Sequence, residues 1–423
     1  MSDAFEVLGT NPIALFSLKL HRGEGMTLLG MNWKNGRPPD DFVGFAIEYK
    51  EPGGAKFFPL KNRLAFPGMA GSVNPNQLST LLSPIQKFRW VHFPRNAELA
   101  GDFTYKVTPV FMDQTDVLSY GEAQTAAIQL RRETYPNVLN VAFTRGFVSS
   151  QAFVDRYGAD TVAALLPAKA DDGLDFTPTY PKDKAEAAYA WMGFEARSAI
   201  LEVLDQAIAD QTAKVRVVAY DLNDPEIVSR LERVGKRLKV IVDDDGAHGE
   251  ATSCETQAAK RLAKSAGKAN VKRQHLGKLQ HNKTIVVDGQ TQLAVCGSTN
   301  FSWRGVFVQN NNAIIFRDRG VVKIFAAAFD NYWNKGSSVA DFGKSISATW
   351  QKLGLAGIDA QIGFSPRLKK KGCRLENDCG RHREEHDFKP LLFARISLRN
   401  PRADSGCDHE ASKRRRYFFI RHF

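Results

Sequence analysis

A histidine and a lysine two positions apart, His281 and Lys283, are the residues of this sequence best suited to chemistry. Side chains alternate across a β-strand, so residues i and i+2 project from the same face. An imidazole can attack or carry a proton near neutral pH, and an ammonium group can balance negative charge on oxygen atoms. The pair therefore favours chemistry at a phosphate.

Strand and turn signals surround this pair and must position it. An apolar run follows Lys283 and ends at Asp288-Gly289, and a second apolar run occupies residues 293–296. Two apolar runs joined by a turn of this kind predict a β-hairpin. Ser298 and Asn300 follow the return strand and supply small hydrogen-bonding side chains where that strand leaves the sheet.

The complete pattern, His-x-Lys-x4-Asp followed by Gly-Ser-x-Asn, resembles the signature of the phospholipase D superfamily, whose members cleave or transfer phosphodiesters. The resemblance implies that His281 is the nucleophile or its acid partner, and that Lys283 binds phosphate. It further implies that Asp288 supports the histidine, while Ser298 and Asn300 help to seat the phosphate. It calls for no metal and no other cofactor. The alternative is a surface hairpin that carries a histidine and a lysine by chance.

Residues further along extend the resemblance, which covers roughly residues 188–340. Phe301-Ser302-Trp303-Arg304-Gly305 and Asn310-Asn311-Asn312 occupy places where superfamily members often have an aromatic residue, an Arg-Gly pair and a polar residue that contacts the site. Trp303 could instead be a packing residue.

The sequence departs from the superfamily pattern in having one His-x-Lys motif, since related enzymes build one site from two. Residues 346–366 look like the start of a second half, but the alternation of helix and strand stops there. Residues 367–423 hold 16 Lys and Arg against 8 Asp and Glu, and we predict a basic tail that is disordered or out of frame. Within it, Cys373, Cys379, His382 and His386 are of types that bind zinc, but their spacing is unusual for a zinc site, and we predict none.

Composition limits the class of protein. The 423 residues are 43% hydrophobic and 25% charged, as in ordinary globular proteins, and are long enough for two or three domains. The net charge of +12 belongs mostly to the tail. We see no signal peptide and no apolar run long enough to span a membrane, and the five cysteines follow no disulfide framework. We predict a cytoplasmic, bacterial protein.

The predicted fold is an α/β phospholipase D-like domain, with helices packed on a mixed sheet, preceded by an all-β sandwich. Short strands separated by Gly, Pro and Asn turns predict the sandwich over residues 1–131, and its segment 103–107 resembles fibronectin type III or immunoglobulin-like domains. Residues 132–190 are predicted to connect the parts, with a helix over 149–166 and a surface loop over 167–184. Helical and strand periods alternate over residues 191–345, as helices packed on a sheet require.

We therefore expect a phosphodiesterase or phosphatidyltransferase that works through a phosphohistidine, with a phospholipid or a nucleic acid as substrate. Two alternatives stay open. In the first, the chain is a single-motif nuclease that completes its site as a homodimer. In the second, it is a catalytically inert binding module, as the missing second motif would suggest.

Overall fold

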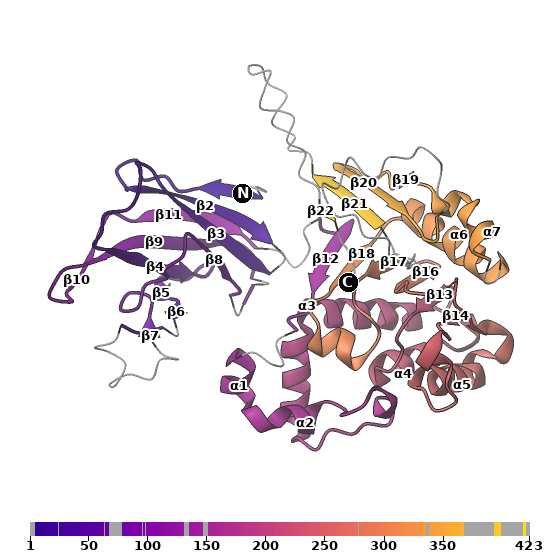
Figure 1. The fold of residues 1–423 in the computed structure, drawn as a ribbon. Helices are drawn as coiled ribbons and strands as arrows, with labels where there is room; N and C mark the ends of the chain where they lie inside the picture. The colour runs from indigo at the N-terminus through magenta and orange to yellow at the C-terminus, as the bar shows by residue number, and fades with distance from the viewer. Residues whose placement is uncertain are drawn as a thin grey trace. The chain divides into compact units, whose positions relative to one another are not determined.

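The computed structural model describes ten stretches of the chain and the backbone of two further strands. It describes residues 5–23, 25–62, 64–66, 78–94, 96–97, 99–130, 135–146, 151–277, 279–335, 338–367, 393–398 and 418–419. The chain forms two compact units, Met1–Pro136 and Asn137–Phe423, shown in Figure 1. The four tail residues of types that bind zinc, Cys373, Cys379, His382 and His386, lie outside the described residues.

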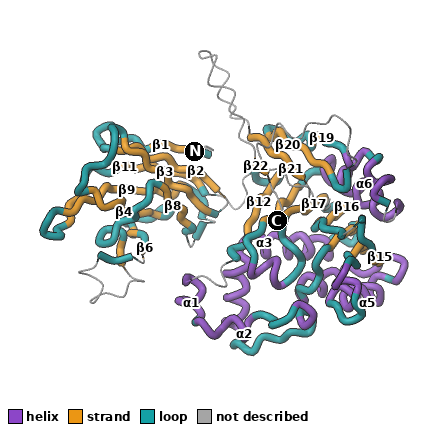
Figure 2. The backbone as a smooth tube through the Cα atoms, viewed as in Figure 1, coloured by secondary structure: helices purple, strands orange, loops and turns teal. Residues whose placement is uncertain are grey.

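Unit 1 is built almost entirely from antiparallel strands, as Figure 2 shows by colour. One sheet has the order β1-β2-β3-β8, a second has the order β10-β9-β4-β5 with β11 also paired to β9, and β6 and β7 form a separate pair. The strands are β1 (Glu6–Leu8), β2 (Phe16–Gly23), β3 (Met26–Trp33), β4 (Phe42–Lys50), β5 (Phe58–Pro59), β6 (Lys61–Asn62), β7 (Leu78–Ser79), β8 (Arg89–His92), β9 (Asp102–Met112), β10 (Leu118–Tyr120) and β11 (Gln124–Gln129).

The two larger sheets of unit 1 contribute side chains to one hydrophobic core. Alternate residues of β2 are buried, beginning with Phe16, and β9 buries Phe103, Tyr105 and Val107 in the same cluster. This alternation is the pattern expected of strands with one buried face. His92 belongs to the packing of this unit. Its Nδ1 lies 3.0 Å from the Tyr105 hydroxyl, and burial lowers the pKa of His92 to about 4.

Unit 2 is organised on a seven-stranded mixed sheet with the order β12-β18-β17-β16-β13-β14-β15. β13 pairs with β14 and β14 with β15 in parallel, whereas the other neighbours are antiparallel. The strands are β12 (Leu139–Phe143), β13 (Lys214–Ala219), β14 (Leu238–Val242), β15 (Val271–Arg273), β16 (Thr284–Asp288), β17 (Gln292–Gly297) and β18 (Asn312–Phe316).

Helices cover both faces of this sheet, which buries its nearly continuous apolar strands (Figure 1). Helices α3 (Lys182–Ala209), α4 (Pro225–Val234) and α5 (Cys254–Ala266) share one core with side chains such as Val217 and Ile285. Helix α6 (Arg319–Lys335) packs on β13, β16 and β17. The α/β architecture predicted for residues 191–345 is therefore present. Asp224 and Ser253 are the N-cap residues of α4 and α5, and their side chains accept hydrogen bonds from amides in the first turn of each helix.

The predicted connecting segment, residues 132–190, is more than a connection. β12 is an edge strand of the seven-stranded sheet, and the buried Leu174 belongs to its core. The helix predicted over 149–166 is broken into α1 (Gln151–Tyr157) and α2 (Val162–Leu165) by Gly158, whose φ is 93°. Periodicity alone did not register this break, because the apolar spacing continues across the glycine.

A second, four-stranded sheet of unit 2 follows α7 (Val339–Gly343) and has the order β19-β20-β21-β22. β19 (Gln351–Lys352) and β20 (Ile358–Gly363) fall in the stretch predicted to open a second half, so a strand does begin there. β21 (Phe393–Leu398) and β22 (Phe418–Phe419) belong to the predicted tail, and β21 pairs with β20 in antiparallel register.

Candidate functional site

One edge of the seven-stranded sheet gathers the residues with chemical potential. β13 and β14 are parallel, with Ala219 opposite Val242, so both strands end at this edge. β16 runs antiparallel to β13, with Thr284 opposite Val218, so β16 starts there. β17 ends at the same edge, and the Gly-Ser-Thr-Asn segment that follows its last residues is placed there too. Open α/β sheets present their ligand sites at the carboxyl ends of parallel strands.

His281 and Lys283 lie together in the extended segment that leads into β16, and both approach the ring of Tyr220. The His281 and Tyr220 ring centroids are 4.5 Å apart, and Nζ of Lys283 is 4.9 Å from the Tyr220 centroid. Nζ also donates a 2.5 Å hydrogen bond to the main-chain oxygen of His281. The two residues of the motif are thus brought to the same aromatic side chain.

Lys283 is buried to a degree that changes its charge. Its exposed fraction is 2%, and it lines one small cavity with Gly297, Thr299 and Asn312. Burial lowers the pKa of Lys283 to about 7, although the carboxylates of Asp221 and Asp243 oppose this change. The ammonium form therefore needs a nearby negative charge near neutral pH.

Ser298 and Asn300 shape the turn that faces this cavity. The Ser298 hydroxyl accepts a hydrogen bond from the amide of Asn312 (2.9 Å), and its own amide donates to the Asn312 main-chain oxygen (2.9 Å). Asn300 is 9% exposed, and its side-chain oxygen is buried with no hydrogen-bond partner among the described residues. The turn is therefore fixed by Ser298, while Asn300 keeps hydrogen-bonding capacity.

Asp288 does not lie beside the histidine that it was predicted to support. It ends β16 at the opposite end from His281, where it forms an ion pair with Arg216 (3.3 Å) and approaches Gln292. Asp288 is seven positions along the chain from His281, which corresponds to roughly 20 Å in extended backbone. The expected support of His281 by Asp288 is therefore corrected. The aspartate instead joins β16 to β13.

The residues after Asn300 serve mainly to hold loops in place. Trp303 is buried, and its indole nitrogen donates to the main-chain oxygen of Gly173 (2.8 Å), so the packing alternative applies to this residue. The Asn311 side chain donates to the main-chain oxygen of Gly305 (2.8 Å). Both contacts connect the region after the Gly-Ser-x-Asn turn to neighbouring segments of unit 2.

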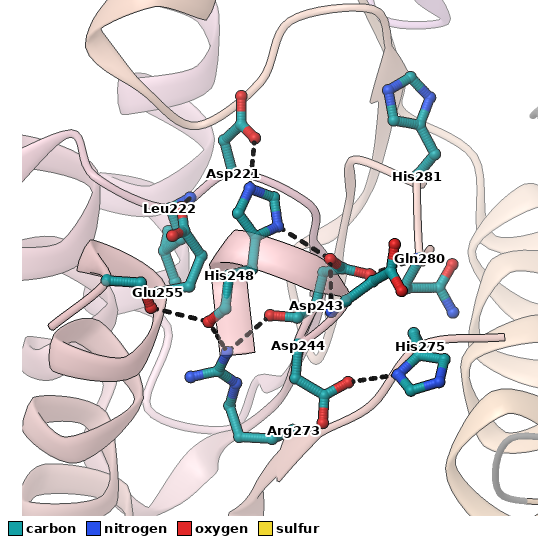
Figure 3. A network of polar contacts seen from close by, with 12 residues as sticks. Asp221, Leu222, Asp243, Asp244, His248, Glu255, Arg273, His275, Gln280 and His281 are labelled. Carbon is teal, nitrogen blue, oxygen red and sulfur yellow. Dashed lines mark hydrogen bonds and ion pairs between the residues drawn. The ribbon is translucent and has the colours of Figure 1, made fainter. Parts of the chain in front are cut away.

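A second histidine at this edge, His248, was not singled out from the sequence. Its Nδ1 lies 2.8 Å from Oδ2 of Asp243, which is fully buried, and its Nε2 lies 3.3 Å from Oδ1 of Asp221 (Figure 3). The ring centroid is 4.6 Å from that of Tyr220, the same ring that His281 contacts. Asp243 also accepts a hydrogen bond from the amide of Gln280, the residue before His281.

The two carboxylates determine the protonation of His248. Burial alone would lower its pKa, but the hydrogen bonds to Asp221 and Asp243 raise the pKa of His248 to about 10. No motif in the sequence points to this histidine, and the Asp243-Asp244-Asp245 run directly follows β14. Beside it, Asp244 holds His275 through Nδ1 (2.8 Å).

Asp221, His248 and Glu255 place one potential metal-ligand atom each within 4.8 Å of one another. The potential ligand atoms of these residues are engaged in hydrogen bonds within the protein. Nε2 of His248 contacts Asp221, and Glu255 accepts from the amide of Leu222 (3.1 Å). A histidine must be neutral to bind a metal, whereas these carboxylates favour the protonated ring. We therefore assign no metal here.

A mixed sheet covered by helices, with the His-x-Lys and Gly-Ser-x-Asn residues at one edge, defines a phospholipase D-like domain. Residues 202–333 match the family model described as "Cardiolipin synthase, PLD-like domain". Over these residues, the match confirms the resemblance to the phospholipase D superfamily seen in the sequence.

Individual relatives share limited parts of the chain. A mitochondrial cardiolipin hydrolase of Chlamydomonas reinhardtii is 27% identical over 114 residues, which are 27% of this chain and 46% of that protein. The phospholipase D family member Nuc of Salmonella typhimurium is 24% identical, with a TM-score of 0.29, over 33% of this chain and 88% of Nuc. NucT of Helicobacter pylori is 15% identical, with a TM-score of 0.28, over 34% and 92% of the two chains. The chain thus spans about half the length of the curated relative.

Among the described residues, no helix combines the length and apolar character needed to cross a bilayer.

Proposed function

We propose that unit 2 carries a phosphodiesterase or phosphatidyltransferase centre in which His281 is the nucleophile. Lys283 binds the phosphate oxygens, together with Ser298 and Asn300. The observation that carries this proposal is the convergence of His281 and Lys283 on Tyr220, at the sheet edge where the Gly-Ser-x-Asn turn also lies. The match of residues 202–333 to the phospholipase D-like family model supports the same reaction class.

The reaction follows from the chemistry of these side chains. A neutral imidazole nitrogen of His281 attacks phosphorus, and the bond from phosphorus to the leaving oxygen breaks as that oxygen takes up a proton. The product is a phosphohistidine and a free alcohol. Water or an acceptor alcohol then attacks phosphorus, gives up a proton and releases His281.

Lys283 is suited to respond to substrate. Its pKa of about 7 leaves it partly neutral in the free protein, because it is buried. A phosphodiester anion beside Nζ favours the ammonium form, so binding substrate takes up a proton. The positive charge is then present where charge develops on the phosphoryl oxygens.

A lipid phosphodiester is our first choice of substrate class, because the matching family model and the curated relative are both named for cardiolipin. Nucleic acid is the second choice.

Two arrangements of the site remain as alternatives: a homodimer in which two copies of His281 meet across a two-fold axis, and a binding module without turnover. For unit 1, we propose a β-sandwich of the fibronectin type III kind, which the shared core of its two sheets supports.

The test uses the full chain with methyl p-nitrophenyl phosphate, bis(p-nitrophenyl) phosphate and cardiolipin vesicles as substrates. We expect turnover by the wild type, no turnover by His281→Ala, and a phosphorus adduct on His281 by mass spectrometry after acid-free quenching. His275→Ala is the matched control, because His275 is a histidine of the same region whose side chain is 41% exposed and paired with Asp244. Full activity of His281→Ala would remove the nucleophile assignment, and no turnover by the wild type would favour the binding module.

Sedimentation of the same preparation separates the two active arrangements. An active monomer would exclude the homodimer. Activity that falls on dilution together with the dimer fraction would support it. This measurement is needed because the described residues contain one His-x-Lys motif.

A further inference from the structure

We propose that His248 is a second catalytic histidine of this centre and that its Nε2 donates the proton to the leaving oxygen when His281 attacks phosphorus. The proposal rests on the proposed function and adds the proton donor that the His-x-Lys motif alone does not provide. His248 belongs to no motif recognised in the sequence, and its assignment comes from its position at the sheet edge.

The two imidazoles share one aromatic neighbour. The Tyr220 centroid lies 4.6 Å from that of His248 and 4.5 Å from that of His281, so the imidazole centroids are within about 9 Å of each other, the sum of these distances. Reacting groups approach within about 3–3.5 Å, so a phosphoryl group held between two nitrogen atoms spans roughly 6–7 Å. This upper limit on their separation is compatible with both rings reaching one phosphoryl group.

The hydrogen bonds of His248 differ at its two nitrogen atoms in the way that a proton donor requires. Nδ1 is held at 2.8 Å by Asp243, whose side chain is fully buried. Nε2 makes the longer contact, 3.3 Å, with Asp221, whose side chain is 23% exposed. The buried carboxylate fixes the ring, as the third member of a catalytic triad does. The outer carboxylate can be displaced by a substrate oxygen.

The surroundings keep this ring protonated in the absence of substrate. The charged or titratable groups around it come from several elements, and the two bound carboxylates outweigh the burial of the ring. These groups are Asp221 and Tyr220 after β13, Asp243 after β14, Glu255 in α5, and Arg273 in β15, which donates to the His248 main-chain oxygen. A protonated donor matches an alkoxide leaving group, which is strongly basic.

The proposed step is balanced within the site. The Nε2–H bond of His248 breaks as the new O–H bond forms on the leaving group, and the His281 N–P bond replaces the P–O bond. His248 is then neutral, with Nδ1–H still directed to Asp243. In the second step Nε2 takes a proton from the attacking water or alcohol, which restores the imidazolium when phosphorus leaves His281.

The experiment compares two substrates that differ only in the leaving group. Methyl p-nitrophenyl phosphate releases a weakly basic phenolate that needs little protonation, whereas methyl phenyl phosphate releases a more basic one. For His248→Gln we expect a loss of about 10²–10⁴-fold with the phenyl substrate. The loss with the p-nitrophenyl substrate should be no more than about tenfold. His275→Gln, which alters the neighbouring His–Asp pair, should change neither rate.

The outcomes separate this proposal from the proposed function. Equal losses with both substrates would show a structural role for His248 and overturn the donor assignment, while leaving His281 as nucleophile. Unchanged rates with both substrates would also overturn it. Absence of turnover by the wild type would overturn the proposed function, and the donor assignment with it.

A second variant covers the case in which His248→Gln fails to fold. Asp221→Asn leaves Asp243 in place and removes one of the two charges that keep the ring protonated. We expect the alkaline limb of the pH–rate profile to move to lower pH with the phenyl substrate, and to stay in place with the p-nitrophenyl substrate. Identical profiles for Asp221→Asn and the wild type would contradict the proposal.

Discussion

Asp288 and Arg216 form an ion pair, with 3.3 Å between Oδ2 and Nη1, that joins β16 to β13 at the end of the strand remote from His281. Their side chains are 39% and 16% exposed, so solvent screens much of the attraction. We expect Asp288→Asn to lower the free energy of unfolding by about 0.2–1 kcal/mol, as for other partly exposed pairs. Urea denaturation at low and high salt measures this effect.

The same variant tests whether Asp288 takes part in the reaction. Because the pair lies far from His281, turnover of a phosphodiester by Asp288→Asn should stay within about twofold of the wild type. In a catalytic triad, replacing the orienting aspartate by asparagine costs about 10⁴-fold. A loss of that size in a folded variant would restore the role that the sequence suggested.

Lys283→Met should stabilise the protein at neutral and acid pH. The pKa of Lys283 is about 7 in the folded protein and 10.5 without burial, so the folded state binds fewer protons between these values. Stability from this group therefore rises with pH across the window from 7 to 10.5, and the penalty is complete below pH 7. Methionine removes the penalty, and we expect a gain of about 1–4 kcal/mol at pH 6 that disappears near pH 10. Chemical denaturation across this range measures it.

One outcome would contradict the prediction for Lys283→Met. If Lys283→Met is no more stable than the wild type at pH 6, the ammonium is paired in the folded protein and its pKa is not depressed. Lys283→Arg provides the control, because arginine stays charged throughout the range and should be destabilising at every pH.

His248→Gln should change stability with the opposite dependence on pH. The folded pKa of His248 is about 10 and the ordinary value is 6.5, so the imidazolium stabilises the fold fully below pH 6.5 and loses this effect as pH rises to 10. We expect a loss of about 1.5–3 kcal/mol at pH 6, the range for hydrogen bonds to charged groups, and a much smaller loss at pH 10. A difference that is constant with pH would mean that the ring is neutral in the fold.

Between pH 7 and 10, the contributions of Lys283 and His248 to the free energy of unfolding change with pH in opposite directions, so they offset each other in the wild type. Lys283→Met should therefore leave a stability that falls with pH in this range, and His248→Gln one that rises. Comparison of the two single variants with the double variant tests whether the sites are coupled through Asp221 and Asp243, which affect both pKa values.

The sequence predicted those parts of the site that depend on local pattern. The apolar runs on either side of Asp288-Gly289 predicted the hairpin of β16 and β17, and the structure contains it. The periodicity of apolar residues predicted an all-β unit followed by helices on a mixed sheet, because strand and helix periods differ along the chain. The family resemblance came from residue types at fixed spacing and is confirmed over residues 202–333.

Features that depend on tertiary contacts were missed or misplaced. His248 acquires its role from Asp221, which precedes it by 27 positions and meets it only because β13 and β14 end at one edge. Asp288 had the expected residue type, but an extended strand carries it away from His281. The burial of Lys283 was not foreseen either, since a lysine in sequence gives no sign of the Tyr220 ring and the Gly297 turn around it.

Gly297, the last residue of β17, should be intolerant of a side chain. Its φ is +146°, and a Cβ atom there would collide with the main-chain oxygen of Asn312 and lie 3.0 Å from Cα of Ala313. We expect Gly297→Ala to cost more than about 1–3 kcal/mol, because backbone strain adds to the steric conflict. It should also weaken phosphodiester turnover, since Ser298 binds Asn312 at the same place.

Gly267 provides the matched control for this last prediction. Its φ is +96°, but a Cβ atom there would meet nothing within 4 Å, so Gly267→Ala tests backbone strain without a collision. Its cost should stay within about 1–3 kcal/mol, and turnover should be unchanged because the residue lies at the end of α5. Thermal and urea denaturation of both variants, with activity on one aryl phosphodiester, completes the comparison. Equal stability and equal activity of the two variants would show that β17 and β18 can separate at this edge without disturbing the site.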